Sequence, residues 1–600
     1  MSNKQFLTNE SGVSTVGQLF EKNVNSSPDA TAIRWNGTSY SYAELDKRVG
    51  QIAQSLMNSG VEAGSAVGVF QPRSFDLIAS VLGIMRAGCV MVPLDPAYPA
   101  PRTLQIIQQA GLNTVLSQGD VKNTLPESVN VVDVNTIAAD AAAFNGAVET
   151  DADQVSYMIF TSGSSGVPKG VMLPQRTLVN LMHAQLDQHD SFAQAMTTLQ
   201  FTSLNFDVSL QEIFSTLSFG GTLVLMNEQQ RNNFKDMLAL INDENVARVF
   251  MPYAVLQGLI DAAEQYGMSL PSLQVVVTAG EQLKITPSIR EFFSRHNDVA
   301  LINHYGPTET HLATSYVLSG DAADWADLPS IGGAITGVKL YVLDETGEPV
   351  KAGETGELFI GGAQVGLGYI GNDEQTAAAF VNDPFAGVDQ AVMYKSGDLV
   401  RVEANGELAF LGRNDDQVKI AGNRVELGEI EIQLMKAEGV QEAAVVALTS
   451  ESGQRSLAAA VIPTGTANCE PATLKAQLAD MLPAHLIPGQ WQLVHALPKM
   501  PNGKLNRNAI AEEFGAPPVA TAAAQNAETT LEKLAAIWCS VLELETVSPE
   551  DDFFDIGGHS FSMMKLKVQI DAVFGVDIGE VEFFDNTELG LLAALIDTKL

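Results

Sequence analysis

Short runs of β-branched and other apolar residues alternate with amphipathic stretches through roughly the first 410 residues of the chain. The strand-like runs lie at 66–70, 114–116, 155–161, 222–226, 246–251, 273–278 and 339–343. Between them, residues 42–59 and 75–86 carry apolar side chains at helical spacing. Strands that alternate with helices are typical of parallel or mixed sheets covered by helical layers. From about residue 350, glycine-punctuated runs at 356–362 and 400–412 predict hairpins and small antiparallel sheets instead.

The chain has 600 residues, which is too many for one simple domain. Hydrophobic residues make up 46% of it, so it can bury several cores. We expect a large α/β part over 1–414 and, after a charged break, a compact α+β unit over 415–513. The Pro/Ala-rich stretch 514–527 predicts a linker. The acidic residues 528–600, with apolar side chains at helical spacing, predict a separate small helical bundle.

The chain is strongly acidic, with 34 Lys and Arg against 71 Asp and Glu and a formal net charge of −37. A nucleic-acid backbone or an anionic membrane needs clustered basic surface, so we expect neither as a partner. No apolar run reaches the roughly 18–20 residues of a membrane-spanning helix, and the polar start, Met1–Ser11, predicts no secretory signal. The cysteines Cys89, Cys469 and Cys539 have no pair spacing. These features predict a protein of the reducing cytoplasm.

A glycine- and hydroxyl-rich run at 160–170, FTSGSSGVPKG, follows an apolar strand-like segment. Glycines let backbone N–H groups approach an anion closely, and hydroxyl groups add hydrogen-bond donors. Lys169 adds a mobile positive charge that suits a polyphosphate. The run differs from the P-loop pattern because Pro168 precedes the lysine and Gly170 follows it. It predicts a phosphate-binding loop, although an ordinary Gly/Ser surface turn has a similar composition.

Further motifs lie on both sides of this run in a fixed order along the chain. They are YAEL at 42–45, RAG at 86–88 with VPLDP at 92–96, NFDVS at 205–209, NHYGPTE at 303–309, GELFIGG at 356–362, YKSGDL at 394–399, GRNDDQVKI at 412–420 and PNGKLNR at 501–507. Together with the loop at 160–170 they resemble adenylate-forming enzymes, in particular the adenylation domains of nonribosomal peptide synthetases. The motif DFFDIGGHS at 552–560 resembles a peptidyl carrier domain. The resemblance covers essentially the whole chain. It implies an α/β core of stacked mixed sheets with helices and a small β-barrel-like part, a small α+β C-terminal subdomain, and an all-α four-helix-bundle carrier domain.

The resemblance implies that ATP and Mg²⁺ are used to join a substrate carboxylate to AMP, with release of pyrophosphate. The residues that would hold the β- and γ-phosphates are Thr161, Ser162, Gly163, Ser164, Ser165 and Lys169. Around the rest of the nucleotide, the assigned residues are Tyr305 at the adenine, Thr308 at the α-phosphate, Glu309 at Mg²⁺, and Asp398 with Arg413 at the ribose. Lys504 would bridge the carboxylate and the α-phosphate, and Lys419 would add positive charge to the site.

Asp207, within NFDVS, is the acid that would accept the substrate's amine, although its place before a helix-like stretch also suits a helix cap. The other pocket positions implied by the family are Val208, Gln211, Tyr253, Val277, Ala279, His304, Leu312 and Ala313. With Asp207 and Lys504 this lining is similar to those of proline-activating domains. We therefore expect proline as the substrate. Valine or another small apolar amino acid is the alternative, because one methylene group is worth only about 1–3 kcal/mol of discrimination.

In this family the C-terminal subdomain turns on a hinge between two half-reactions, and Asp415 matches the hinge position. One face would present Lys504 for adenylation, and the other would present the hairpin at 417–422 for thioester formation. Ala421 departs from the arginine often found in that hairpin. Ser560 by itself would be a good helix cap. The resemblance makes it the attachment site of 4′-phosphopantetheine, whose thiol would collect the activated amino acid.

The expected protein is an adenylation–carrier didomain that loads an amino acid onto its own carrier. No condensation domain precedes it and no thioesterase follows, so we expect a starter or loading unit of antibiotic or other secondary-metabolite synthesis. Its expected partners are a phosphopantetheinyl transferase and a downstream condensation or tailoring enzyme. A ligase that transfers acyl groups to free coenzyme A is one alternative, and a non-catalytic scaffold that kept the fold is another.

Overall fold

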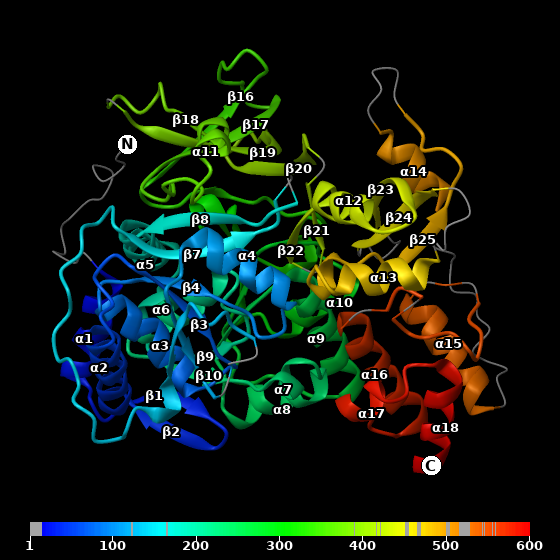
Figure 1. The fold of residues 1–600 in the computed structure, drawn as a ribbon, viewed down its shortest axis with the longest axis horizontal. Helices are drawn as coiled ribbons and strands as arrows, with labels where there is room; N and C mark the ends of the chain where they lie inside the picture. Colours follow the sequence, from blue (N-terminus) through cyan, green and yellow to red (C-terminus); the bar gives the residue numbers. More distant parts are fainter. Residues whose placement is uncertain are drawn as a thin grey trace.

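A computed structural model describes residues 15–600, with gaps in that range. The residues outside the description are 1–14, 120, 122–123, 164–165, 389, 416, 421, 450–454, 465–469, 500–504, 515–528, 543, 545, 555 and 559, and the side chains of 560 and 561. Figure 1 shows a large N-terminal part, a smaller unit that follows it, and a helical unit at the C-terminus. Among the described residues, no helix is long and apolar enough to cross a membrane.

The largest sheet has nine strands in the order β15-β14-β13-β12-β11-β9-β10-β1-β2. Its strands are β1 (Thr31–Trp35), β2 (Thr38–Ser41), β9 (Thr197–Gln200), β10 (Thr222–Leu225), β11 (Arg248–Met251), β12 (Val275–Thr278), β13 (Ala300–Tyr305), β14 (Thr314–Leu318) and β15 (Gly333–Ala334). The strands from β1 to β13 along this order are parallel, and β2, β14 and β15 are antiparallel additions at the two edges.

A second sheet has six strands in the order β6-β5-β3-β4-β7-β8. They are β3 (Ala66–Phe70), β4 (Val90–Pro93), β5 (Thr114–Ser117), β6 (Asn130–Asp133), β7 (Val155–Thr161) and β8 (Lys169–Pro174). All pairs are parallel except β7 with β8, which brackets the predicted phosphate loop. The expectation of mixed sheets with helical layers is confirmed.

Helices between the two sheets fill the main core. They are α1 (Val16–Ser26), α2 (Tyr42–Asn58), α3 (Phe75–Arg86), α5 (Gln175–Gln188) and α6 (Val208–Leu217), and their buried side chains join those of β1, β3, β7 and β10 in one cluster. Helix α3 is buried from Leu77 to Arg86, which explains its apolar sequence. The outer faces are covered by α4 (Ala100–Ala110) on the six-stranded sheet and by α8 (Phe234–Asp243), α9 (Tyr253–Tyr266) and α10 (Pro287–Arg295) on the nine-stranded sheet, with α7 (Glu228–Arg231) before α8.

The glycine-punctuated region forms a third, five-stranded antiparallel sheet, as its pattern predicts. It consists of β16 (Val338–Leu343), β17 (Thr355–Gly362), β18 (Phe380–Asn382), β19 (Val392–Val402) and β20 (Leu408–Arg413), with helix α11 (Asp373–Ala379) before β18. The last strand, β20, leads directly to the smaller unit.

The unit after β20 begins with a hairpin and continues as a three-stranded sheet with helices. Its elements are β21 (Gln417–Ile420), β22 (Asn423–Glu426), α12 (Leu427–Lys436), β23 (Val440–Thr449), β24 (Arg455–Pro463), α13 (Pro471–Ala479), β25 (Gln490–Leu493) and α14 (Arg507–Glu513). We call this unit the C-terminal subdomain.

The last unit is a helical bundle, which we call the carrier domain. Its helices are α15 (Thr530–Leu542), α16 (Ser560–Phe574), α17 (Glu580–Phe584) and α18 (Leu589–Lys599). Trp538, Phe553 and Phe583 pack at its centre, and the Phe553 ring centroid lies 5.2 Å from that of Trp538 and 5.4 Å from that of Phe583. The short helix α17 has too few residues to show helical periodicity in the sequence. The predicted linker at 514–527 lies almost entirely outside the described residues.

Candidate active site

The predicted pocket residues gather at the carboxyl ends of parallel strands of the nine-stranded sheet. In open α/β sheets this edge forms the ligand-binding crevice. Tyr253 opens α9 after β11, Val277 and Ala279 lie at the end of β12, and His304 lies near the end of β13. Asp207, Val208 and Gln211 lie at the start of α6 after β9, and Leu312 and Ala313 lie between the 3₁₀ turn η4 (Thr308–Thr310) and β14. The topology therefore brings segments far apart in the sequence to one edge.

Asp207 stands at the start of α6, where its side chain makes no capping hydrogen bond to the helix. Asp207 thus occupies the N-cap position of α6 without the side-chain hydrogen bond that a capping residue normally makes. Only 9% of the residue is exposed. Burial raises the pKa of its carboxyl to about 7, and the nearby charge of Lys419 acts in the opposite direction. A buried carboxylate of this kind is stabilised by a cationic partner such as an amine.

Two glutamines on α5 hold the polar side chains of the pocket. Gln185 Nε2 donates to Gln211 Oε1 at 3.4 Å, and Gln188 Oε1 lies 3.0 Å from His304 Nε2. Burial lowers the pKa of His304 to about 3, so its ring is neutral at physiological pH. Neither glutamine could be identified from the sequence motifs, because α5 lies outside them. Asp207 is therefore the one acidic side chain among the predicted pocket positions.

Asp398, at the predicted ribose site, is buried and already hydrogen-bonded. The Tyr305 hydroxyl donates to it, and Arg413 Nη1 donates to its Oδ1 at 2.7 Å. The Tyr305 ring belongs to a buried cluster that includes Ala313 and Ile331. Burial and the Asp398 charge raise the pKa of Tyr305 well above its usual value, which keeps the hydroxyl a donor. The roles of Tyr305 at the adenine and Asp398 at the ribose stay predictions.

Asp415, the predicted hinge residue, lies in the short connection between β20 and β21. Both of its oxygens accept from Arg413, at 2.6 Å from Nε and 2.7 Å from Nη2. Arg413 thus joins Asp415 to Asp398, because the same guanidinium binds both acids. Asp415 lies in the segment that connects the N-terminal part to the C-terminal subdomain. Arg413 therefore ties this segment to the predicted ribose site.

Glu309 lies in η4 and is fully buried. Arg424 Nη1 donates to both of its oxygens at 2.8 and 2.9 Å, and the Tyr369 hydroxyl donates to Oε1 at 2.7 Å. Burial alone would raise the pKa of Glu309, but Arg424 and Tyr369 outweigh it and hold that pKa below its usual value.

An ionised carboxylate such as Glu309 is a suitable ligand for Mg²⁺, which is bound by one or two carboxylates together with phosphate oxygens. The described residues contain no cluster of three or more His, Cys, Asp or Glu side chains that could hold a metal ion. The single ionised carboxylate of Glu309 fits a Mg²⁺ whose other ligands are phosphate oxygens of a nucleotide. In the arrangement seen, Arg424 supplies the positive charge at Glu309.

The predicted phosphate loop joins β7 to β8, and Thr161 pairs with Lys169 across the two strands. Ser164 and Ser165 lie outside the described residues. Ser162 Oγ donates to the carbonyl of Arg424 at 2.8 Å, and Lys169 Nζ lies 3.3 Å from Glu426 Oε1. The loop is therefore covered by β22 of the C-terminal subdomain.

The β21–β22 hairpin also lies against residues that flank the predicted amino-acid pocket. A Cβ added to Gly422 would lie 3.3 Å from Pro252, which precedes Tyr253, and Gly422 also approaches Gly280, which follows Ala279. Gly422 has φ +81°, a conformation that favours glycine. Burial lowers the pKa of Lys419, while the carboxylates of Asp398 and Asp207 act to raise it. Lys419 is therefore near enough to Asp398 and Asp207 for its charge to interact with both acids.

Lys504 lies outside the described residues. The described residues on either side of it belong to the C-terminal subdomain. Lys499 forms an antiparallel β-bridge with Leu505, and Lys499 Nζ forms an ion pair with Glu442 Oε1 at 2.8 Å. The face of the subdomain that carries the hairpin is thus the one presented to the site. This is the arrangement expected for thioester formation rather than for adenylation.

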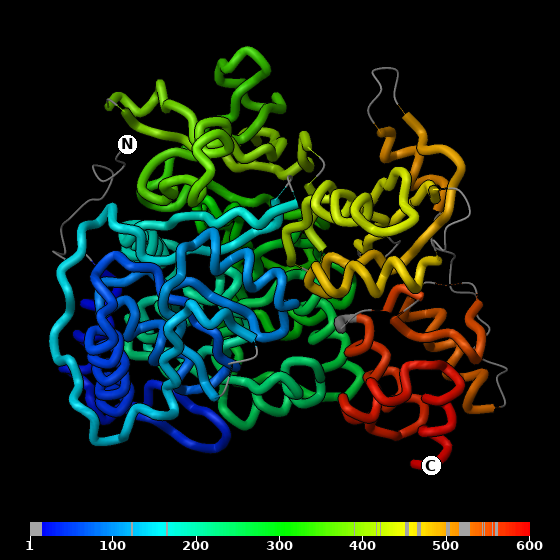
Figure 2. Tube along the Cα trace, viewed as in Figure 1, coloured from blue at the N-terminus to red at the C-terminus, as the bar shows by residue number. Residues whose placement is uncertain are grey.

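The carrier domain contacts the N-terminal part through α16. Met564 and Val568 are buried in the cluster formed by α8 and α9. Lys235 Nζ pairs with Asp571 Oδ2 at 2.6 Å, and Gln265 Nε2 donates to the carbonyl of Val568 at 3.1 Å. Figure 2 shows α16 beside α9, with the carrier domain in red next to the green core.

The carrier domain also contacts the C-terminal subdomain close to its predicted attachment site. Lys475 Nζ donates to the carbonyl of Phe554 at 2.6 Å. Gly489 and Gly557 approach so closely that a Cβ on Gly489 would lie 2.8 Å from the Gly557 Cα. Ser560 is the first residue of α16. The carrier domain therefore rests on both other units, with the start of α16 near their junction.

The interactions that join the hairpin to the core could not be predicted from the sequence motifs. Arg424 and Glu426 lie just beyond the quoted motif at 412–420, and Tyr369 lies between two quoted motifs. A possible signal was the charged alternation in NRVELGEIE at 423–431 directly after the motif. Their partners could not be identified, because the contacts join residues more than 100 positions apart.

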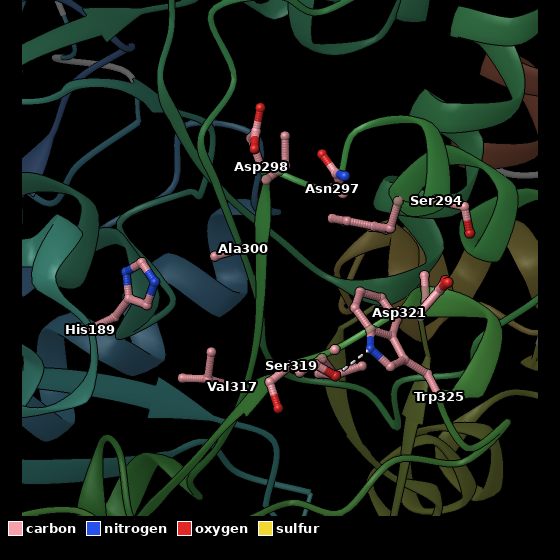
Figure 3. Close-up of a pocket in the computed structure, with 14 residues that line it drawn as sticks. His189, Ser294, Asn297, Asp298, Ala300, Val317, Ser319, Asp321 and Trp325 are labelled. Carbon is pink, nitrogen blue, oxygen red and sulfur yellow. Dashed lines mark hydrogen bonds between the residues drawn. The ribbon is translucent and has the colours of Figure 1, made fainter.

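A cavity of about 570 Å³ lies at the opposite end of the nine-stranded sheet, near the start of β13 and the end of β14 (Figure 3). Its lining includes His189, Asp298, Asp321 and Trp325, and Trp325 Nε1 donates to the carbonyl of Ser319 at 2.9 Å. No predicted site residue lines it. The cavity is therefore separate from the candidate active site.

Three family models match the chain in the order that the motifs predict. The model described as AMP-binding enzyme matches residues 20–370, the AMP-binding enzyme C-terminal domain matches 429–504, and the phosphopantetheine attachment site matches 532–596. The first match alone covers more than half of the chain.

Among curated relatives, the chain is 35% identical to tyrocidine synthase 2 of Brevibacillus parabrevis over 97% of its own length, which is 16% of that protein. It is also 35% identical to gramicidin S synthase 2 of Brevibacillus brevis over 94% of its length, which is 12% of that protein. The chain thus spans under a fifth of these relatives.

Among solved structures, the chain is similar to holo-PA1221, a protein with adenylation and carrier domains, at a TM-score of 0.83, 26% identity, and coverage of 97% and 96% of the two chains. It is also similar to the four-domain synthetase AB3403 at a TM-score of 0.60 and 27% identity, over 97% of this chain and 42% of that one. The chain belongs to the AMP-binding enzymes and joins an adenylation domain of the nonribosomal peptide synthetase type to a peptidyl carrier domain.

Proposed function

We propose that this chain activates an amino acid with ATP as aminoacyl-AMP, releases pyrophosphate, and then loads the amino acid onto its own carrier domain. The arrangement of the hairpin supports the proposal most directly. The β21–β22 hairpin lies against residues that flank the predicted amine pocket, and the carrier domain rests on both the N-terminal part and the C-terminal subdomain. A carboxylate for an amine, a nucleotide site and a docked carrier are the three parts that this reaction needs.

Attack of a carboxylate on the α-phosphate joins two anions, so the protein's contribution is positioning and charge neutralisation. Lys504 would neutralise both groups during attack, and Lys419 would add charge when the hairpin faces the site. Thr308 would bind the α-phosphate, and Glu309 would bind Mg²⁺. Tyr305 would contact the adenine, and Asp398 and Arg413 would bind the ribose. The residues proposed to bind the β- and γ-phosphates are Thr161, Ser162, Gly163, Ser164, Ser165 and Lys169. Mg²⁺ at Glu309 would offset the phosphate charge.

The hydroxyl of Ser560 would carry the phosphopantetheine, whose thiol supplies the nucleophile that accepts the aminoacyl group. Asp207 would hold the substrate's amine at one end of the site. Rotation about Asp415 would exchange Lys504 for the hairpin between the two steps. We propose 1–414 and 415–513 as the two parts of the adenylation domain, 514–527 as the linker and 528–600 as the carrier domain.

Proline is the substrate that we propose. Among the predicted pocket positions Asp207 is the charged group, and His304 is neutral because of its burial. The pocket therefore has no second charge to pair with a charged side chain, and it suits a compact apolar amino acid. Valine or another small apolar amino acid is the alternative, as is an acyl-CoA ligase activity.

The test is ATP–pyrophosphate exchange with the full chain and each proteinogenic amino acid in turn. We expect the highest rate with proline and a lower rate with valine. Exchange with no amino acid would contradict the proposed activity. Release of free acyl-CoA when coenzyme A is added, with no loading of the carrier, would favour the ligase alternative.

Asp207→Asn should raise the KM for the amino acid by about 10–100-fold, because a charged hydrogen bond is worth roughly 1.5–3 kcal/mol. The KM for ATP should change little. Because the pKa of Asp207 is about 7, its protonated form predominates at lower pH and cannot pair with a cation. In the parent chain kcat/KM for the amino acid should therefore fall about tenfold per pH unit well below pH 7.

Asp298→Asn is the matched control, because Asp298 is exposed and lines the distant cavity. Both variants and the parent are compared by exchange kinetics between about pH 5.5 and 8.5, a range that brackets the titration of a carboxyl group with a raised pKa. The Asp207→Asn variant should lose the dependence on pH that the carboxyl causes in the parent. A rise in the KM for ATP with an unchanged KM for the amino acid would remove Asp207 from the amine site.

As partners we propose a phosphopantetheinyl transferase, which would modify Ser560, and a downstream condensation or tailoring enzyme that takes the loaded amino acid. We also propose that the protein works in the cytoplasm, in antibiotic or related biosynthesis. Neither a nucleic acid nor a membrane is part of the proposal.

A further inference from the structure

Two carboxylates of the C-terminal subdomain accept hydrogen bonds from donor groups of the predicted phosphate loop. Glu426 Oε1 lies 3.3 Å from Lys169 Nζ, and Glu429 Oε2 accepts from the backbone N–H of Gly163 at 3.1 Å. Glu429 is fully buried, and Arg102 of the N-terminal part holds its other oxygen. A backbone N–H and a lysine are the donors that a polyphosphate would need. The loop therefore already binds anions, and these anions are side chains.

Further contacts seat the subdomain on the same loop. Ser162 Oγ donates to the carbonyl of Arg424 at 2.8 Å and lies 3.2 Å from the backbone nitrogen of Glu426. Gln433 Nε2 on α12 donates to the carbonyl of Gly166 at 3.3 Å. The described part of the loop thus contacts β22 and α12 along its length. A ligand on these groups would have to displace the subdomain.

We infer that Glu426 and Glu429 are positioning residues that take the place of the β- and γ-phosphates on the loop, so that this subdomain arrangement and bound magnesium pyrophosphate exclude each other. The inference rests on the proposed function, which assigns the loop to those phosphates. A donor that serves a carboxylate oxygen cannot serve a phosphate oxygen at the same time. Two sets of anions in one site also repel each other strongly.

The ion pair between Arg424 and Glu309 also opposes the binding of magnesium pyrophosphate in this subdomain arrangement. Arg424 Nη1 binds both oxygens of Glu309, the carboxylate proposed for Mg²⁺. The hairpin therefore supplies a cation at the metal position, while Glu426 and Glu429 supply anions at the phosphate position. Departure of magnesium pyrophosphate would free both sets of groups, and the subdomain would then fill them. Glu426, Glu429 and Arg424 thus hold the subdomain on the loop and on Glu309 only when these groups bind no magnesium pyrophosphate.

The kinetic test separates the two half-reactions in Glu426→Gln and Glu429→Gln. ATP–pyrophosphate exchange should persist, and the KM for ATP should fall about threefold, because the ATP-competent arrangement becomes more populated. Single-turnover loading of the holo carrier from preformed aminoacyl-AMP should slow about tenfold in either variant, because the loading arrangement becomes less populated. Glu438→Gln is the matched control, because Glu438 is exposed beyond the end of α12. It should change neither step.

A second measurement needs no catalysis. Hydrogen exchange of the β21–β22 amides is followed by mass spectrometry in the holo full chain, with magnesium pyrophosphate added and neither amino acid nor AMP present. In the parent chain pyrophosphate should raise exchange in this hairpin. In a Glu426→Gln/Glu429→Gln chain exchange should be high already, and pyrophosphate should add little.

The outcomes distinguish this inference from the proposed function. Exchange activity with no amino acid would contradict the proposed function. Normal exchange activity in the parent with equal losses of both half-reactions in the variants, or hairpin protection that saturating pyrophosphate leaves unchanged, would overturn the inference alone. A variant that merely misfolds would lose both activities and would show raised amide exchange throughout the subdomain; the single variant Glu426→Gln, at a partly exposed residue, guards against that result.

Discussion

Replacement of Ser560 by alanine is expected to abolish covalent loading of the carrier domain while ATP–pyrophosphate exchange continues at nearly the parent rate. Alanine has no hydroxyl group to which phosphopantetheine could be attached. Ser560 opens α16, and alanine is a good helix former, so the bundle should persist. Exchange requires the pocket around Asp207 and the phosphate loop, whose described residues belong to the N-terminal part.

The measurement is the intact mass of the full chain after treatment with a phosphopantetheinyl transferase, coenzyme A, ATP, Mg²⁺ and proline. The parent chain should gain the prosthetic group and then the amino acid, and the alanine variant should gain neither. Ser540→Ala is the control, since Ser540 is an exposed serine on α15 of the same domain. Added mass on the Ser560→Ala chain would place the attachment elsewhere.

The fold of the large part could be predicted because its signals are local. Strand β3 and helix α3 have the bounds that the sequence predicted, at 66–70 and 75–86. In each case a run of apolar side chains is buried, as its composition implies. The order of alternating strands and helices then restricts the topology to covered parallel or mixed sheets.

The layout of the site could be predicted only as a set of residue types. The resemblance of the motifs to adenylation domains identified Asp207, Glu309 and Asp398, and each is buried in the structure. Spacing says nothing about how one unit rotates on another, because such contacts join distant positions and depend on which of two faces is presented. The pairing of Arg424 with Glu309 is therefore visible only in three dimensions.

The same limit explains the carrier interface. Lys235 and Asp571 are ordinary surface charges in the sequence, and they pair because α16 docks against α8 and α9 while the carrier domain also contacts the C-terminal subdomain. The close contact between Gly489 and Gly557 could not be predicted either. Gly557 lies in a recognisable motif, but no neighbouring residue in the sequence indicates that Gly489 packs against it. Contacts between units thus carry information about the reaction cycle that motifs do not contain.

Replacement of Lys504 by alanine should separate the two half-reactions in the opposite sense to the glutamate variants. We expect ATP–pyrophosphate exchange to fall by about 10²–10³-fold, as for the loss of one preorganised charge-stabilising group. Loading from preformed aminoacyl-AMP should stay within a few-fold of the parent rate. The described residues of the subdomain that contact the site belong to the hairpin and to α12. The described residues on either side of Lys504 pair within the subdomain.

The two steps differ in the charge that each of them needs. During adenylation two anions meet, and without Lys504 their repulsion is opposed mainly by Mg²⁺ and the loop. During loading the pyrophosphate has left, and Lys419 and Arg424 lie against the acids of the site. Exchange kinetics and single-turnover loading of the same preparation measure both steps. Lys499→Ala is the control, because it removes a lysine from the same segment whose exposed pair with Glu442 is worth about 0–1 kcal/mol. An equal loss of rate in both steps would show that Lys504 stabilises the subdomain as a whole. It would contradict the role of Lys504 in neutralising the carboxylate and the α-phosphate.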